Sequence, residues 1–308
     1  MQVLRAADPD AVADARRSGE FLWLDLLSPT PEELQQAAEL FGLHPLAVED
    51  AQEFGQLPKL ERYGDWLLLV FYGAGQDADG EAELVETHLF VSSDWLVTVR
   101  REPCLSLEHL REGEAPDDRW IVYRVVDALT DSFFPVLAAV DQQIEALEDR
   151  VIGGDADIAR RDVLALRRSA LPLRRVLLAQ RDAFDTASSE LTRLPGLGAA
   201  SADYFRDVGD HLRRLAGRAD SDRDRLMGVL DMADNAATAR LNHILERLTL
   251  VSTIFLPLTA AVSFFGMNFG WMVEHIESMS AFLLLGVSLP VLIAVGLLGF
   301  FRRRGYLD

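Results

Sequence analysis

The polarity pattern near the C-terminus divides into two apolar runs with a short polar break between them. Leu248–Phe265 and Met279–Phe301 contain no Asp, Glu, Lys, Arg or His. A helix needs about 20 apolar residues to cross the hydrocarbon layer, and both runs approach that length. Because the break at 266–278 is short, the pattern predicts two membrane helices in a hairpin, joined by a loop at 266–278.

The charges that flank the two runs predict how the hairpin is oriented. Arg302–Arg304 follow the second run and open a basic tail at 302–308, and Arg247 precedes the first run. The loop carries Glu274 and Glu277 but no Lys or Arg. By the positive-inside rule we expect a multi-pass protein of the inner (plasma) membrane with both termini in the cytoplasm. The two loop glutamates would then attract cations from outside.

Residues 1–120 alternate strand and helix patterns, which predicts a cytosolic α/β domain with a small mixed sheet. A helix is predicted to start at Thr30, its N-cap, with Pro31 in the first turn. Glu33 can complete a capping box with Thr30, and Gly42 marks the end of the helix. A second short helix opens at His44-Pro45 and runs through Asp50. Strands are expected at 21–27, 66–72, 84–91 and 95–99.

From about residue 120 the strand patterns stop and helical spacing takes over. Long helices are expected at 120–150, 155–184 and 202–265, which divide into a cytosolic helical hairpin at 121–200 and a stalk helix at 201–265 that becomes the first membrane helix. Pro135 and Pro172 each predict a kink or a break. A helix of roughly 60 residues extends about 90 Å. It cannot fold back on a compact domain, so we expect it to pack against copies of itself.

A seven-residue repeat of small and hydroxylated side chains follows one seam of this last helix. Such a repeat is typical of parallel helices around a shared axis. Dry packing of the helices explains small residues on a membrane helix equally well. Asn242 at one end, Asn268 just beyond the other and the loop glutamates favour a cation pore, in which Leu245, Leu248 and Leu256 could gate by dewetting. The seam comprises Asn242, Thr249, Leu256, Ser263, Leu245, Ser252, Thr259 and Gly266.

The overall charge bears on the possible partners. The 308 residues carry 30 Lys and Arg against 49 Asp and Glu, a formal net charge of −19. This balance argues against nucleic acid, because phosphate binding needs a basic surface, and it suits a protein that collects cations. The one cysteine, Cys104, excludes an intrachain disulfide. No glycine-rich phosphate loop or nucleophile motif is present, so we do not expect an enzyme.

The sequence closely resembles the CorA family of magnesium channels. The resemblance rests on the segment TIFLPLT at 253–259, on FGMNF at 265–269 and on the second apolar helix with its basic tail. Upstream, Phe41–Asp50, Gln56–Lys59 and Tyr204–Asp207 also resemble the family. The likeness therefore spans nearly the whole chain.

The resemblance implies a homopentamer in the lipid bilayer that passes divalent cations, Mg²⁺ and also Co²⁺ and Ni²⁺, passively into the cytoplasm. Asn268 would form the outer ring, shaped by Gly266 and Met267. Cytosolic Mg²⁺ would close the channel by binding between protomers, with Asp207 as one ligand and Asp77 as the other. The residues lining the pore would be Asn242, Leu245, Leu248, Ser252, Leu256, Thr259 and Ser263.

Two other functions remain open at this point. One is zinc transport on the same architecture, which His275 in the loop allows, although zinc prefers nitrogen and sulfur ligands and the seam carries no His or Cys cluster. The other is a membrane-anchored sensor or scaffold whose helices pack without a pore.

Overall fold

The computed structural model describes residues 2–76, 82–112, 120–194, 201–267, 270–275 and 278–306. Its backbone packing divides the chain into two units, Met1–Ala233 and Asp234–Asp308. The first unit holds a β-sheet and its covering helices, and the second holds the two apolar segments.

A six-stranded sheet forms the centre of the first unit, in the order β1-β2-β6-β5-β4-β3. β1, β2 and β6 pair in parallel, whereas β6, β5, β4 and β3 pair antiparallel. The sheet is therefore mixed, as the sequence predicts. The strands are β1 Gln2–Leu4, β2 Leu22–Leu27, β3 Lys59–Tyr63, β4 Trp66–Gln76, β5 Ala82–Val91 and β6 Trp95–Arg100.

Helices cover both faces of this sheet, because successive side chains of a strand point to opposite sides and both sets are apolar. Leu68 and Val70 of β4 join one core with helices α1, α2 and α3. Leu67 and Leu69 join a second core with α4 and α5. The helices around the sheet are α1 Pro9–Ser18, α2 Pro31–Phe41, α3 Pro45–Glu53, α4 Leu105–Glu112 and α5 Ile121–Asp131.

The local signals that predict α2 and α3 act as expected. Thr30 Oγ1 accepts the backbone N–H of Glu33, and the Glu33 carboxylate accepts the N–H of Thr30, which completes the capping box. Gly42 ends α2 with φ +66°, a conformation that glycine adopts without a Cβ penalty. His44 caps α3 through Nδ1, which accepts the N–H of Leu46.

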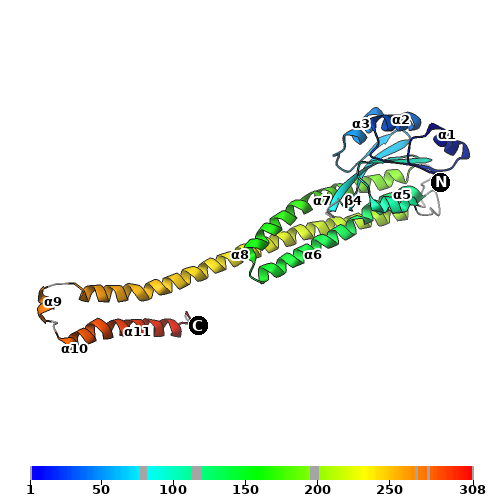
Figure 1. Cartoon of the computed structure of the whole chain (residues 1–308). Coiled ribbons are helices and arrows are strands. Elements are labelled where there is room, and N and C mark those ends of the chain that lie inside the picture. Colours follow the sequence, from blue (N-terminus) through cyan, green and yellow to red (C-terminus); the bar gives the residue numbers. More distant parts are fainter. Residues whose placement is uncertain are drawn as a thin grey trace. The chain divides into compact units, whose positions relative to one another are not determined.

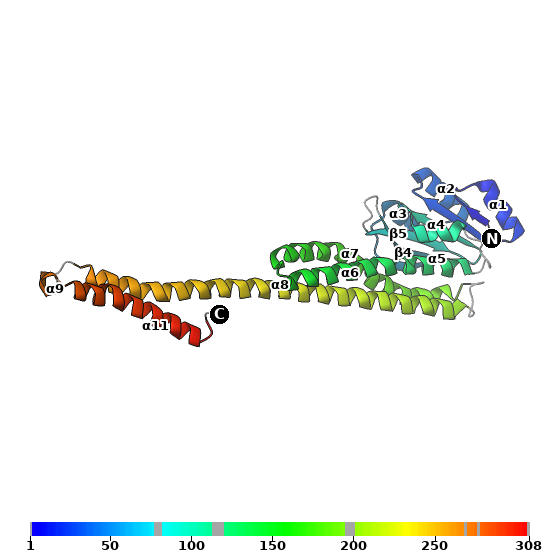
Figure 2. The same cartoon turned by 60° about the horizontal axis from the view of Figure 1, so that its bottom comes forward.

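Three long helices run side by side beyond the sheet and share a third core (Figures 1 and 2). They are α6 Phe133–Ile152, α7 Ala156–Leu191 and the first part of α8 Ala202–Phe265. The helix expected at 120–150 is broken at Ser132, close to Pro135, which has no N–H to donate to the carbonyl of Asp131.

Helix α7 differs in part from the sequence-based expectation. Of the kink or break expected at Pro172, the structure excludes the break, because the helix continues through that residue. It also continues past Phe184 to Leu191, because Ala187 and Leu191 are buried in the core formed with α5.

Strand β4 continues past the end of its neighbour β3, and side chains satisfy its uncovered edge. The pairing with β3 stops at Val70. Beyond it, the buried Gln180 amide accepts the N–H of Tyr72 at 2.7 Å and donates to its C=O at 3.1 Å, and Ser132 Oγ accepts the N–H of Ala74. A Cβ at Gly73 would lie 2.7 Å from Leu129 Cδ2, so glycine lets α5 approach closely enough for the Ser132 contact.

The second unit contains the end of α8, a loop and a returning helix (Figure 1). Two helices are long and apolar enough to cross a membrane, Ala202–Phe265 and Met279–Arg303, with mean hydropathies of 1.9 and 2.6 over their most apolar stretches. We call these apolar parts the first and second spans. The second span contains a π-helical segment, in which Ser288 Oγ donates to the Leu283 carbonyl. The elements after α8 are α9 Gly270–His275, α10 Met279–Ala281, η3 Phe282–Ser288 and α11 Leu289–Arg303.

Replacing Gln180 by leucine tests the side-chain cover of β4. Gln180→Leu leaves the N–H and C=O of Tyr72 buried without partners, and each orphaned group costs about 1–3 kcal/mol. We expect a clear fall in the thermal midpoint of the first unit, followed by tryptophan fluorescence. Gln35→Leu is the matched control, because Gln35 is exposed and its amide donates to the exposed part of α2 at Glu39. Equal midpoints for the two variants would show that the Gln180 bridge does not stabilise the strand.

Candidate ion pathway and metal-binding cluster

The less exposed residues of the first span form a single stripe. A helix turns about 100° per residue, so Leu250, Ile254, Leu258 and Ala261 lie on one face. These residues are half-buried, whereas most of the span is exposed. Leu250 lines a cavity together with Phe300 of the second span. The stripe is therefore the face that the first span turns toward the second.

The residues predicted to line a pore lie on the other side of this helix. Leu245, Ser252, Leu256, Thr259 and Ser263 are centred roughly half a turn from the stripe, and Leu256 is 76% exposed. Leu248 and Asn242 are exposed as well, with Asn242 at the margin of this face. We call this surface the seam face. The second span does not cover it, so the seam face is available to another chain or to a central space.

Hydroxyl groups on the seam face point their hydrogens back into the helix. Ser252 Oγ donates to the Leu248 carbonyl at 2.9 Å, and Thr259 Oγ1 donates to the Phe255 carbonyl at 2.8 Å. The remaining lone pairs of each oxygen are acceptors. Such oxygens can accept hydrogen bonds from the water shell of a cation without displacing that water.

Basic groups near the start of the first span lie away from the seam face. His243 and Arg247 fall on the same side of α8 as Leu250 and Leu258. His243 Nδ1 is 3.7 Å from Glu246 Oε2. The imidazole of His243 and the charge of Arg247 are thus directed away from the surface that would meet a cation.

The segment between the spans is described only in part. Gly266 ends α8, where its N–H donates to the Val262 carbonyl at 2.9 Å, and Met267 follows it. Glu274 is exposed on α9. Asn268 and Glu277 lie outside the described residues, and their roles stay predictions.

A separate group of side chains in the first unit has the composition of a metal site. One ligand atom each from Asp127 on α5 and from Asp207 and His211 on α8 lie within 4.8 Å of one another. His211 Nδ1 is 2.9 Å from Asp131 Oδ1, and His211 Nε2 is 3.7 Å from Asp207 Oδ2. With Nδ1–H donating to Asp131, Nε2 keeps its lone pair toward Asp207, as in metal-binding histidines held by a carboxylate. We call these three residues the acidic cluster.

The electrostatics of Asp127 also fit a cation. Burial, together with the neighbouring carboxylate of Asp131, raises the pKa of Asp127. Its Oδ2 accepts the Tyr123 hydroxyl at 3.2 Å, whereas its buried Oδ1 has no hydrogen-bond partner among the described residues. Burial and the charge of Asp127 raise the pKa of Tyr123 to about 12, so this phenol stays a donor. A bound cation would supply the positive charge that the carboxylates lack.

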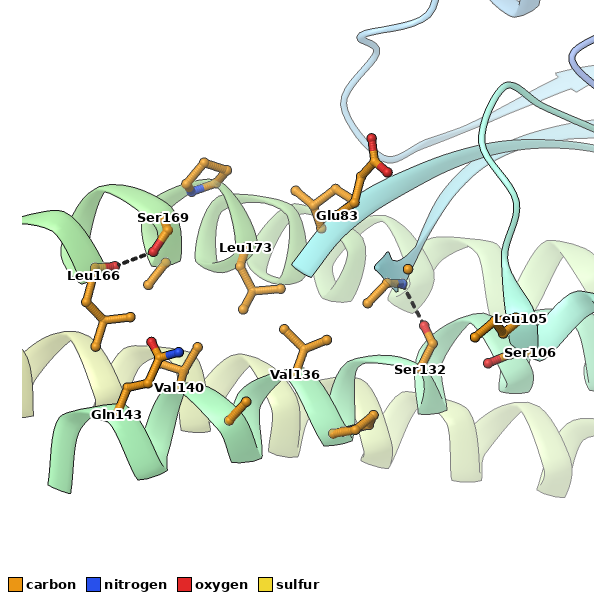
Figure 3. A pocket seen from close by; sticks show the side chains of 17 residues that line it. Glu83, Leu105, Ser106, Ser132, Val136, Val140, Gln143, Leu166, Ser169 and Leu173 are labelled. Carbon is orange, nitrogen blue, oxygen red and sulfur yellow. Dashed lines mark hydrogen bonds between the residues drawn. The ribbon is translucent and has the colours of Figure 1, made fainter. Parts of the chain in front are cut away.

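A cavity of the first unit has a different character. It has a volume of about 670 Å³ and lies between α6, α7 and the ends of β4 and β5 (Figure 3). Its walls are mainly apolar, with Val136 and Leu173 on facing helices. Ser132 and Ser169 already bond to the backbone, and Glu83 is the one ionisable residue of the described lining. The cavity offers no ligand set for a divalent cation.

A protein-family model described as CorA-like Mg²⁺ transporter protein matches residues 18–303. The chain belongs to this family. Membership confirms the resemblance noted in the sequence, and it confirms that the chain is a membrane transporter rather than an enzyme. The two spans are the hydrophobic segments that such a transporter needs.

Curated relatives cover most of the chain and differ in the cation that they are named for. The cobalt/magnesium transport protein CorA of Thermotoga maritima is 26% identical over 88% of this chain and 79% of its own length. The zinc transport protein ZntB of Yersinia enterocolitica is 27% identical over 88% of this chain and 83% of its own. Membership of the family therefore shows divalent cation transport, but it does not show which cation is transported.

Solved structures confirm the fold. The CorA magnesium transporter from Methanocaldococcus jannaschii superposes with a TM-score of 0.81 at 20% identity, covering 92% of this chain and 91% of that chain. Full-length CmaX superposes with a TM-score of 0.69 at 23% identity, covering 91% and 87%. An α/β unit, a long helix and two apolar C-terminal helices are common to this architecture and to the fold predicted from sequence.

The acidic cluster contains one residue that the sequence analysis predicted as a metal ligand and two that it did not. Asp207 lies in the acidic cluster, whereas Asp77 lies outside the described residues and stays a prediction. Sequence reasoning missed Asp127 and His211. The spacing of Asp207 and His211, four apart on one helix, was a readable signal. Nothing in the sequence indicated that Asp127, on another helix, would meet them.

The raised pKa of Asp127 predicts a specific dependence on pH. A carboxyl whose folded pKa lies above its unfolded value of about 3.8 favours folding at low pH, and that contribution is lost as the pH rises through the folded pKa. Asp127→Asn has no carboxyl to ionise at this position, so it does not lose stability as the pH rises through that pKa. Without metal, its thermal midpoint should exceed that of the parent at pH 7, and the difference should shrink as the pH approaches 4.

The thermal midpoints of the parent and of Asp127→Asn are then measured again with added Mg²⁺ or Co²⁺. A cation bound to the acidic cluster stabilises the folded parent by mass action, and Asp127→Asn should lose most of that stabilisation. Equal midpoint shifts of parent and variant on adding metal would exclude Asp127 as a ligand.

Proposed function

We propose that the chain assembles into a homopentamer in which the five first spans surround a pathway for hydrated divalent cations, Mg²⁺ foremost and Co²⁺ and Ni²⁺ also. The cations move passively into the cytoplasm, and both chain termini lie on that side of the inner (plasma) membrane. The observation that carries the proposal is the seam face. It presents hydroxyl oxygens from a membrane span, on the side that the second span leaves uncovered.

A polar face on a membrane helix needs a polar environment. Lipid offers no hydrogen bonds to Ser252, Thr259 or Ser263, so these oxygens are better placed against water or another chain than against hydrocarbon. Related copies around a common axis would turn their seam faces inward and their stripes outward, where the second spans shield them. The long α8 helix gives such copies a shared surface.

The chemistry of the pathway suits Mg²⁺. This ion gives up its water shell reluctantly, so neutral oxygens that accept hydrogen bonds from the shell are better suited to it than carboxylates that would hold the ion. In the proposal Asn268 forms the outer ring, with Gly266 and Met267 shaping the turn. Glu274 and Glu277 raise the cation concentration at the outer mouth.

Leucines on the seam face supply the closure. Leu245, Leu248 and Leu256 are exposed on or near that face and would form apolar constrictions that empty of water when narrow. Asn242 marks the inner mouth. When the pathway is open, an inside-negative potential of 100 mV drives a divalent cation inward with about 4.6 kcal/mol, at about 2.3 kcal/mol per charge.

Regulation is assigned to the acidic cluster. In the proposal cytosolic Mg²⁺ binds at Asp207 with the help of Asp127 and His211, and a carboxylate such as Asp77 completes the site from a neighbouring copy. The orphaned oxygen of Asp127 and the orientation of His211 support a metal here. Occupation of this site holds the pathway closed.

Zinc transport is the second candidate function. Similarity to proteins named as zinc transporters and the nitrogen donor of His211 favour it. Uptake of Mg²⁺, Co²⁺, Ni²⁺ and Zn²⁺ by liposomes that contain the full chain separates the two candidates. Magnesium uptake supports the first, and uptake of zinc without magnesium supports the second.

Two threonines of the first span allow a matched test of the seam face. Thr259 lies on it and Thr253 lies about a quarter turn away, and each hydroxyl donates to the carbonyl four residues earlier. Thr259→Val removes an acceptor from the pathway, so Mg²⁺ uptake into liposomes should fall about tenfold, the equivalent of one lost hydrogen bond. Thr253→Val should retain most of the uptake.

The contrary results are distinct. Equal uptake by the two variants would mean that the seam face does not line the pathway. An absence of divalent flux in the reconstituted parent would instead favour a membrane-anchored sensor or scaffold with closely packed helices.

A pair of aspartates on α8 tests the regulatory assignment. Asp207→Asn weakens the acidic cluster, so the internal Mg²⁺ concentration that halves uptake should rise roughly tenfold or more. Asp203→Asn is the control, because Asp203 lies one turn away and pairs with Arg206 outside the cluster. If both variants close at the concentration of the parent, the regulatory ion binds elsewhere.

A further inference from the structure

A second cavity lies within the second unit, where the two spans meet at the end away from the loop. Its volume is about 500 Å³. One wall belongs to the start of the first span and the other to the end of the second, so the cavity sits at the level where both apolar segments stop. It is lined by Glu246, Thr249, Leu250, Thr253, Phe300, Phe301, Arg304 and Tyr306.

The wall formed by the second span is fixed by a helix-ending motif. Gly305 takes φ +76°, its N–H donates to the Arg302 carbonyl, and the N–H of Tyr306 donates to the Phe301 carbonyl. This pair of bonds is the Schellman arrangement, which turns the chain back on itself. Tyr306 thereby packs edge-on against Phe301, with 6.2 Å between the ring centroids. The last turn of α11 and the residues through Tyr306 thus form one wall of the cavity.

The charged groups of the cavity lie on different walls. Arg304 contributes its guanidinium, which lies 5.5 Å from the centroid of the Phe300 ring and has no carboxylate at ion-pair distance among the described residues. Glu246 contributes a carboxylate from the first span. Thr249 and Thr253 donate their hydroxyl hydrogens to carbonyls of their own helix, so their oxygens face other groups as acceptors.

We infer that this cavity is a binding site for a phospholipid with a primary ammonium in its headgroup. The phosphate binds Arg304, the ammonium donates to Glu246 and the threonine oxygens, and the glycerol end of the acyl chains lies against Leu250 and Phe301. A donor on one wall and acceptors on the other match a headgroup that carries both charges. A purely anionic headgroup would bring its negative charge near the carboxylate of Glu246 without an ammonium to offset it.

The surroundings favour a lipid over a soluble phosphate compound. Basic and aromatic residues at the ends of membrane helices lie at the depth of the headgroups, and pockets between such helices bind lipid headgroups. The apolar residues of the cavity also need an apolar occupant. The lipid site requires only that the chain is inserted in a membrane. Failure of the pore assignment would therefore not exclude it.

Two arginines beside each other supply the test. The full chain is purified in detergent, stripped of lipid and offered phosphatidylethanolamine, phosphatidylcholine or phosphatidylglycerol with identical acyl chains, and the retained lipid is counted by native mass spectrometry. Arg304→Gln should lower phosphatidylethanolamine retention about tenfold, the ratio that one charge-assisted hydrogen bond supplies. Arg303→Gln removes the same charge one residue away, outside the cavity lining, and should retain the lipid.

Glu246→Gln tests the ammonium contact. The parent should prefer phosphatidylethanolamine to phosphatidylcholine, whose headgroup has no N–H to donate, and the variant should lose that preference while still binding both. Soluble phosphoethanolamine should compete only weakly, because it has no acyl chains. Equal losses in Arg303→Gln and Arg304→Gln, equal retention of the three lipids by the parent, or full competition by phosphoethanolamine would each overturn the assignment. Unchanged circular dichroism and oligomer mass show that the variants are folded.

Discussion

A membrane helix that carries hydroxyl groups has to keep them out of hydrocarbon, and this requirement connects most features of the chain. The first span satisfies its hydroxyl hydrogens internally, through bonds to carbonyls one turn back, but the oxygens still accept. Its opposite side is an apolar stripe turned toward the second span. The first span therefore has an apolar side that packs in its own hairpin and a second side, the seam face, that is better placed against water or further copies of the chain. In the proposed function, the hydrated ion passes along the second side.

The same helix also carries the acidic cluster. Asp207 and His211 lie near the beginning of α8, and the seam face lies toward its end, with no helix break between them in the 64 residues from Ala202 to Phe265. In the proposal, regulation and passage would thus involve residues of the same helix. Asp127 lies on α5, which packs on the sheet, so the core of the first unit positions one member of the cluster.

Much of the fold was readable from the sequence, because its signals are local. Uncharged runs located both spans, Thr30 and Gly42 bounded α2, and the strand patterns gave a mixed sheet. Tertiary packing decided the rest. Helix α7 runs through Pro172 and on to Leu191 because neighbouring cores bury its residues. The partnership of Asp127 with Asp207 depends on two helices far apart in the sequence coming together. Asp207 itself was found through family resemblance, which carries long-range information that periodicity lacks.

The uncovered edge of β4 has a consequence for how copies of the chain can meet. Strand edges with free amides recruit strands from other molecules, which is a common route to uncontrolled aggregation. Here the backbone of Tyr72 is occupied by Gln180 and that of Ala74 by Ser132, so this stretch cannot serve as a template for sheet extension. Self-association along that stretch is therefore blocked by the chain's own side chains.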